Sequence, residues 1–189
     1  MVELKLKKTL LRLDFSFFAV IALFLIMDSS GFGIAALAAC GLHEMSHLAI
    51  MTAFGISADS ITFYGAGIRI SSEQTDRVKP PIRAAILLGG CAANFTAAAV
   101  FRFLGNDAAA AINLFKGIFN LLPLGELDGA ALFKMLAIRV CRPENVDRAV
   151  KAASVISAAI IALTAAAFSG EISFTLITTA LYIIIVSTQ

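Results

Sequence analysis

Two histidines and a glutamate lie in the middle of an apolar stretch. Residues 40–51 read CGLHEMSHLAIM, so His43, Glu44 and His47 form the pattern H-E-x-x-H. Positions four apart share one face of a helix, so the two imidazoles could bind one Zn²⁺ while the glutamate reaches a metal-bound water. They are the only histidines in the chain. The alternative is a pair of histidines that join helices only through hydrogen bonds.

A catalytic zinc ion needs a third protein ligand and an open position for water. The chain has no further histidine and the cysteines lack ligand spacing, so an acidic side chain must supply this ligand. The main acids in or beside apolar segments are Asp14, Asp28, Glu126 and Asp128.

Asp128 is the strongest of these candidates because it follows a helix break. Pro123 and Gly125 should interrupt the apolar segment just before it, and irregular backbone at membrane depth is tolerated where it lines a cavity or is buried in protein. Asp128 could instead cap a helix that begins at Gly129. Glu126 is the rival candidate for the third ligand. It could instead lie at the rim of the site without binding the metal.

The composition predicts an integral membrane protein. Hydrophobic residues make up 59% of the 189 residues and charged residues 15%, whereas soluble domains are nearer half and a quarter. The formal net charge of +2 is too small to suggest nucleic acid as a partner. The three cysteines are Cys40, Cys91 and Cys141. Because they are far apart in the sequence, we expect each to be a small buried residue and not part of a disulfide framework.

Apolar segments long enough to cross a bilayer, which takes about 20 residues, recur along the chain. We expect six transmembrane helices, with the first segment retained as a span and not removed as a signal peptide. Very short turns join each odd-numbered span to the next, which predicts three antiparallel helical hairpins. The spans are 10–27, 32–54, 82–104, 108–124, 152–169 and 172–187.

Basic residues set the expected orientation of these spans. Nearly all lysines and arginines precede the first span or lie in the segments that follow the second and fourth spans. By the positive-inside rule, both termini are therefore expected on the cytoplasmic side. This pattern does not explain why Lys116 lies inside the fourth span.

Residues 56–81 do not have a helical pattern. Their β-branched and aromatic residues surround Gly65 and Gly67, which predicts a short membrane-associated β-hairpin between helices 2 and 3. Pro80 and Pro81 then open the third span. The expected fold class is thus an all-α polytopic membrane protein with one hairpin. We expect a single domain over 1–189, with its core at 10–140 and a C-terminal helical hairpin at 150–189.

Three elements together resemble the site-2 protease family of intramembrane zinc metalloproteases. H-E-x-x-H is followed by Gly90-Cys91-Ala92-Ala93-Asn94, which is similar to the family's G-P-x-x-N. The third element, N-x-x-P-x-x-x-L-D-G, runs from Asn120 to Gly129. The elements occur in family order within roughly 10–140.

The resemblance implies that His43, His47 and Asp128 ligate one zinc ion and that Glu44 is the general base. It also implies that Asn94 and Asn120 hold the substrate backbone or steady the oxyanion. The hairpin at 56–81 is similar to the family's membrane-associated strands, which would pair with an unwound substrate segment.

The chain departs from the family pattern in two places. Cys91 replaces the usual proline, and Gly125-Glu126 stands where prolines are common, which puts a charge close to the proposed metal. The compact plan most resembles members that process a membrane-tethered sigma-factor precursor during sporulation. The implied location is a prokaryotic cytoplasmic membrane.

The implied function is hydrolysis of a membrane-associated protein substrate within or near its transmembrane segment, on the cytoplasmic side. Glu44 would assist the attack of a zinc-bound water on the scissile carbonyl. One alternative is a non-enzymatic membrane zinc carrier or sensor, although a carrier has no need of Glu44. Another is a catalytically inactive scaffold that sequesters helical partners.

Overall fold

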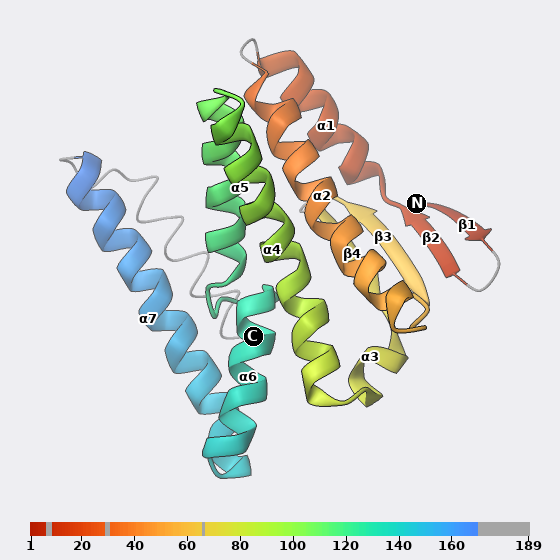
Figure 1. Cartoon of the computed structure of the whole chain (residues 1–189), viewed down its shortest axis with the longest axis vertical. Coiled ribbons are helices and arrows are strands. Elements are labelled where there is room, and N and C mark those ends of the chain that lie inside the picture. The colour runs from red at the N-terminus through yellow and green to blue at the C-terminus, as the bar shows by residue number, and fades with distance from the viewer. Residues whose placement is uncertain (7–8, 29–30, 66, 170–189) are drawn as a thin grey trace. The chain divides into compact units, whose positions relative to one another are not determined.

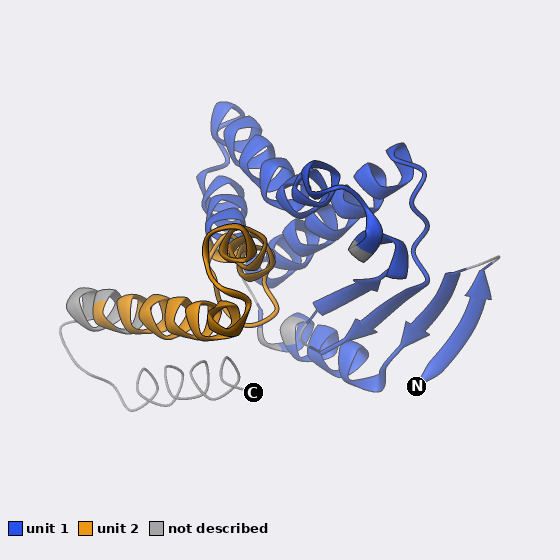
Figure 2. Ribbon diagram, turned by 90° about the horizontal axis from the view of Figure 1, so that it is seen from below, with its two compact units in different colours: residues 1–118 blue, residues 119–189 orange. Residues whose placement is uncertain are grey.

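The described part of the chain is mainly helical and carries one small sheet. The computed structural model describes residues 1–6, 9–28, 31–65 and 67–169. The chain divides into two compact units, unit 1 (Met1–Ile118) and unit 2 (Phe119–Gln189), which Figure 2 colours separately. The sixth expected span, 172–187, lies outside the described residues.

The sheet of unit 1 joins two hairpins that are far apart in sequence. Its strand order is β1-β2-β3-β4, with antiparallel pairs at β1/β2 and β3/β4 and a parallel pair at β2/β3 (Figure 1). The expected hairpin within 56–81 is therefore confirmed, as β3 and β4. The strands are β1 (Val2–Leu6), β2 (Thr9–Leu13), β3 (Ser60–Tyr64) and β4 (Gly67–Ser71).

The sheet also corrects the expected all-α class and the start of the first span. Residues 10–13 were expected to begin the first span, but they belong to β2, and α1 covers Phe15–Met27. An apolar run of this length fits a strand as well as a helix, and pairing of Leu11 with Ile61 of β3 supplies the partner that decides it. The Asp14 carboxylate accepts hydrogen bonds from the hydroxyl and backbone N–H of Ser16, which lower its pKa and start α1.

A second correction concerns the segment after the hairpin. Residues 73–77 were expected to be non-helical, but they form the short helix α3 (Glu73–Arg77). The next helix, α4 (Pro80–Phe103), begins at the two prolines, as expected from their tolerance in a first helical turn.

Two helices of the described residues, α2 (Phe32–Ala53) and α4, are long and apolar enough to cross a membrane. The α1 helix has 13 residues and α5 (Asp107–Asn120) has 14. At about 1.5 Å per residue these helices span roughly 20 Å, less than a hydrocarbon core of about 30 Å. The expectation of six membrane-spanning helices therefore stays a prediction.

A small apolar core connects α2 and α4 to the sheet within unit 1. Met51 near the end of α2, Ile56 in the following loop and Ile86 on α4 are buried together, with Ile70 of β4 packed against them. The α2 helix packs along α4 and also contacts β4. This core fixes the end of α2 that follows the two histidines.

Unit 2 begins where the expected fourth span, 108–124, is interrupted. The helix α5 ends at Asn120, and an irregular segment with Gly125 at φ 51° leads to α6. The predicted break at Pro123 and Gly125 is thus confirmed, while the expected helix to residue 124 is four residues too long. The two remaining helices are α6 (Asp128–Val140) and α7 (Pro143–Ser169).

Contacts within unit 2 join α6 to α7 and α7 to the irregular segment that precedes α6. The α6 and α7 helices pack together. The hydroxyl of Ser154 on α7 donates a hydrogen bond of 2.6 Å to the carbonyl of Pro123. An ion pair of 3.2 Å between Lys134 and Asp147 joins the exposed surfaces of the same two helices. The break is therefore a supported turn of backbone.

The core of unit 1 yields a stability prediction. Ile56→Ala should lower the free energy of unfolding by about 2–4 kcal/mol, because it leaves a cavity between α2, α4 and the sheet. Denaturant unfolding in detergent micelles measures the loss. Ile34→Ala on an exposed position of α2 is the matched control and should change stability much less. Equal losses in the two variants would show that Ile56 is not in a core.

Candidate metal centre

The two histidines lie on one buried face of α2. Residues at intervals of four along this helix are buried, and they form a single stripe that faces α4. The centroids of the two imidazole rings are 4.7 Å apart, and the rings are nearly perpendicular. The stripe consists of Ala39, His43, His47 and Met51.

A buried amide fixes the tautomer of His43. The Nδ1 atom of this ring lies 2.8 Å from Oδ1 of Asn94 on α4. The Asn94 Nδ2 group donates to the carbonyl of Ala39, which can only accept, so the facing oxygen of the amide must accept as well. The His43 Nδ1 atom therefore carries the hydrogen, and Nε2 presents its lone pair.

His47 is held in the same tautomer by backbone. Its Nδ1 atom lies 2.7 Å from the carbonyl oxygen of Ile86, which can only accept a hydrogen bond. The His47 Nε2 atom is thus also left with a lone pair. Metal-binding histidines almost always donate their other ring N–H in this way.

The Asn94 side chain is fully enclosed, with 0% of its surface exposed. Both amide hydrogens are used, since Nδ2 donates to the Ala39 carbonyl and to Oδ1 of Asn113 on α5 at 3.0 Å each. For Asn94 to donate to a substrate, one of these bonds would have to break. In the structure, Asn94 holds the His43 ring.

A glycine on α4 makes room for the His43 ring. A Cβ atom built at Gly90 would lie 2.6–2.7 Å from three atoms of that imidazole, closer than van der Waals contact allows. The neighbouring Gly89 faces the end of the Ile50 side chain instead. The two glycines therefore let α2 and α4 approach each other closely, as small residues do between membrane helices.

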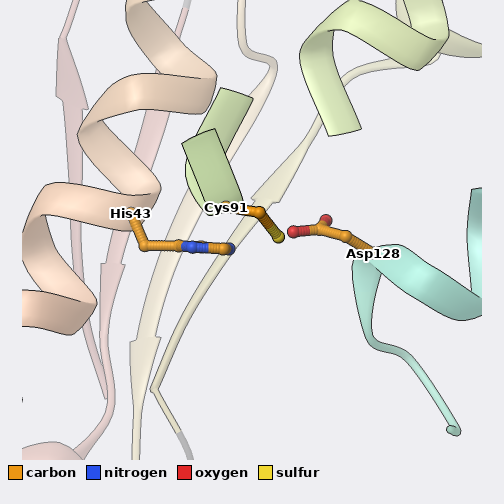
Figure 3. A group of neighbouring side chains, drawn as sticks. All are labelled: His43, Cys91 and Asp128. Carbon is orange, nitrogen blue, oxygen red and sulfur yellow. The ribbon is translucent and has the colours of Figure 1, made fainter. Parts of the chain in front are cut away.

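Cys91 lies beside His43, a position that the sequence did not indicate. Its side chain is buried on α4, and its sulfur lies within 4.8 Å of a ring nitrogen of His43 (Figure 3). Cysteine spacing gave no signal, because the approach of α2 to α4 produces this proximity. The departure from the family's proline was the only feature of the sequence that singled out this residue.

Asp128 belongs to unit 2 and is the first residue of α6. Leu127 is the N-cap, so Asp128 does not take the capping position that was the alternative to ligation. A Cβ atom at Gly129 would overlap the backbone of Leu121, so glycine lets the irregular segment lie against the first turn of α6. A helix N-terminus favours a negatively charged carboxylate at this position.

The remaining expected site residues lie at several degrees of burial. Glu44 is half-buried on α2 next to His43. In unit 2, Asn120 is buried at the end of α5 and the rival ligand Glu126 is exposed. The α5 residue Asn113 is buried and was missed, although it is an amide within an apolar segment.

The histidine pair has the donor chemistry that a zinc ion requires. Zinc binds the unprotonated nitrogen of neutral imidazoles, and in the neutral forms of these two rings that nitrogen is Nε2. A cation near these rings would find two imidazoles on one helix face, and the Cys91 thiol lies beside one of them, His43. Within unit 1, therefore, the histidine pair offers nitrogen ligands of the type that a divalent metal ion binds.

Comparisons with known proteins place the fold. No protein-family model matches the chain, and no curated protein matches it. Among solved structures it is similar to the site-2 protease from Methanocaldococcus jannaschii, with a TM-score of 0.68 and 16% sequence identity. The alignment covers 100% of this chain and 95% of that one. The chain therefore has the fold of a site-2 protease.

Proposed function

We propose that this protein is an intramembrane zinc metalloprotease. Its substrate would be a membrane-associated protein, cleaved within or near its transmembrane segment on the cytoplasmic side. The observation that carries the proposal is the pair of His43 and His47 rings on one face of α2, each with an acceptor at Nδ1, so that the lone pair of the neutral ring is at Nε2. The similarity in fold to a site-2 protease supports it.

In this proposal Asp128 of unit 2 is the third ligand. Its support is the residue type, the position on the first turn of α6 and the motif from Asn120 to Gly129 that the chain shares with the family. Cys91 is the alternative, because its thiol lies beside His43. A thiolate is also a good zinc ligand, so the two residues must be separated by experiment.

When bound, zinc would act as a Lewis acid and lower the pKa of a coordinated water to about 7. Glu44 adjoins His43 on α2 and is only half-buried, so its carboxylate can take a proton from the attacking water. The same side chain would return that proton to the leaving amine. We propose that Asn120 binds the substrate backbone or stabilises the oxyanion. The main role of Asn94 would be to orient the His43 ring.

The proposed setting is a prokaryotic cytoplasmic membrane, with several spans and both termini in the cytoplasm. Two apolar helices and the asymmetry of basic residues support this arrangement. We propose a membrane-tethered protein as substrate, with a sigma-factor precursor of sporulation as the specific candidate. The β4 strand of the hairpin at 56–81 is an edge strand of the sheet, and we propose that it pairs with an extended substrate segment.

The role of Glu44 gives the first test of the proposed function. Glu44→Gln should leave zinc bound at the wild-type level but lower cleavage of a single-span substrate by about 10²–10⁴-fold, because the general base is lost. Zinc content by mass spectrometry and cleavage in proteoliposomes are measured together. Wild-type protein with chelator is the control. Cleavage that survives the substitution would contradict the mechanism, whereas bound zinc without wild-type cleavage would favour a carrier or a sensor.

A second test separates Asp128 from Cys91 as a ligand. Asp128→Ala should weaken zinc binding by more than about tenfold, since the loss of even a supporting partner costs about 10–100-fold. Competition with a chromophoric chelator measures the affinity. Cys91→Ala is compared with Cys40→Ala, a cysteine on the same unit that is not in the candidate centre. Loss of binding in Cys91→Ala alone would transfer the third-ligand role to the thiol.

The space beside His43 gives a third test. Gly90→Ala should lower zinc affinity, because the added methyl group displaces a ring that Asn94 holds in place. Gly89→Ala is the matched control, because its methyl group meets the flexible end of Ile50 and should change affinity little. Equal affinities in the two variants would show that the ring tolerates displacement.

A further inference from the structure

Three buried side chains form one continuous hydrogen-bonded chain across α2, α4 and α5. The His43 ring donates to Asn94, and Asn94 donates to Oδ1 of Asn113. The Nδ2 group of Asn113 donates to the carbonyl of Ala109 at 2.9 Å. His43 is 1% exposed and Asn113 is 4% exposed, so water does not compete strongly for these groups.

A backbone carbonyl sets the orientation of each of the two amides in this chain. The Ala39 and Ala109 carbonyls can only accept, so each amide must turn its Nδ2 group toward them. Each amide oxygen is then left to accept, from His43 in one case and from Asn94 in the other. A single orientation satisfies every member of the chain.

We propose that Asn113 is a positioning residue that fixes the tautomer of His43 through Asn94. Without the Asn113 oxygen, one N–H of Asn94 loses its buried acceptor, and of the two bonds that Nδ2 makes, the one to the Ala39 carbonyl alone opposes rotation of the amide. An Asn94 amide that rotated at the cost of this bond would present Nδ2 to His43, which would favour the tautomer with its lone pair at Nδ1. That tautomer directs the lone pair of His43 into the protein and away from a metal.

This inference rests on the proposed function only for its effect on metal binding. The hydrogen-bonded chain itself lies wholly within unit 1. The readout can therefore be chosen without metal. The chain has two histidines, so ¹⁵N-histidine labelling of the purified full chain yields signals from two rings only. At a pH where both rings are neutral, the ¹⁵N shifts report which nitrogen of each ring carries the hydrogen.

In wild-type protein both rings should be in the Nδ1–H tautomer. Asn113→Leu, which keeps the branching of the side chain at Cγ and removes the acceptor, should convert His43 to a mixture of tautomers or to the Nε2–H form. The ring of His47 is bonded to Ile86 and should stay unchanged, which also reports that the variant is folded. An unchanged His43 in a folded Asn113→Leu protein would overturn the inference.

The conservative variant Asn113→Asp should restore the wild-type tautomer. A protonated aspartic acid can donate to Ala109 and accept from Asn94, so it replaces both bonds of the amide. If Asn113→Leu fails to fold, this variant decides the question, since a His43 ring altered in a folded Asn113→Asp protein contradicts the proposal.

Metal affinity gives the second readout. Asn113→Leu should weaken zinc binding about 10–100-fold, as loss of a partner behind a histidine ligand does. Added to Asn94→Ala, it should cause no further loss, because Asn113 acts only through Asn94. Asn106→Ala is the control on the same helix, since Asn106 caps α5 by accepting from the Ala109 N–H. It should reduce stability without changing affinity.

The outcomes separate this inference from the proposed function. Wild-type protein that binds zinc but cleaves nothing would defeat the protease proposal and leave the role of Asn113 intact. Additive losses of affinity in the Asn94→Ala and Asn113→Leu double variant would defeat the positioning role and leave the protease proposal intact.

Discussion

The hydrogen bond between the His43 ring and the Asn94 amide is the interaction on which the rest of unit 1 depends. It joins α2 to α4 at a fully buried point and decides which ring nitrogen is left for a metal. A buried polar group without a partner costs about 1–3 kcal/mol, so the pair can exist only with every amide atom satisfied. The two glycines on α4 and the Asn113 amide on α5 meet that requirement, since they provide the space and the acceptor.

An irregular segment of backbone between α5 and α6 directly precedes Asp128, the proposed third metal ligand. The break after α5 ends an apolar segment early and starts α6 at an acidic residue, where the helix dipole favours a carboxylate. Ser154 bonds to Pro123 within the break, so the segment does not depend on water for that carbonyl. Such a segment places Asp128 on the first turn of a new helix, which an unbroken helix would not do.

The N-terminal strands show how the same apolar residues can serve two structures. Residues 9–13 have the composition of a membrane span, but in unit 1 they pair in parallel with β3, which comes some fifty residues later. The sheet then has β1 and β4 at its edges, and α1 and α2 both contact it. A strand so placed connects the start of α1 to the end of α2, the helix that carries the two histidines.

The sequence by itself determined the features that depend on short spacing. Histidines four apart share a helix face, prolines start α4, and Pro123 with Gly125 interrupts the apolar segment after α5, because each follows from local backbone geometry. The tertiary structure alone decided that residues 9–13 are a strand, that Cys91 lies beside His43, and that Asn113 supports Asn94. These relations join residues 19 to about 50 positions apart, and no periodicity in a single sequence reports which helices pack together.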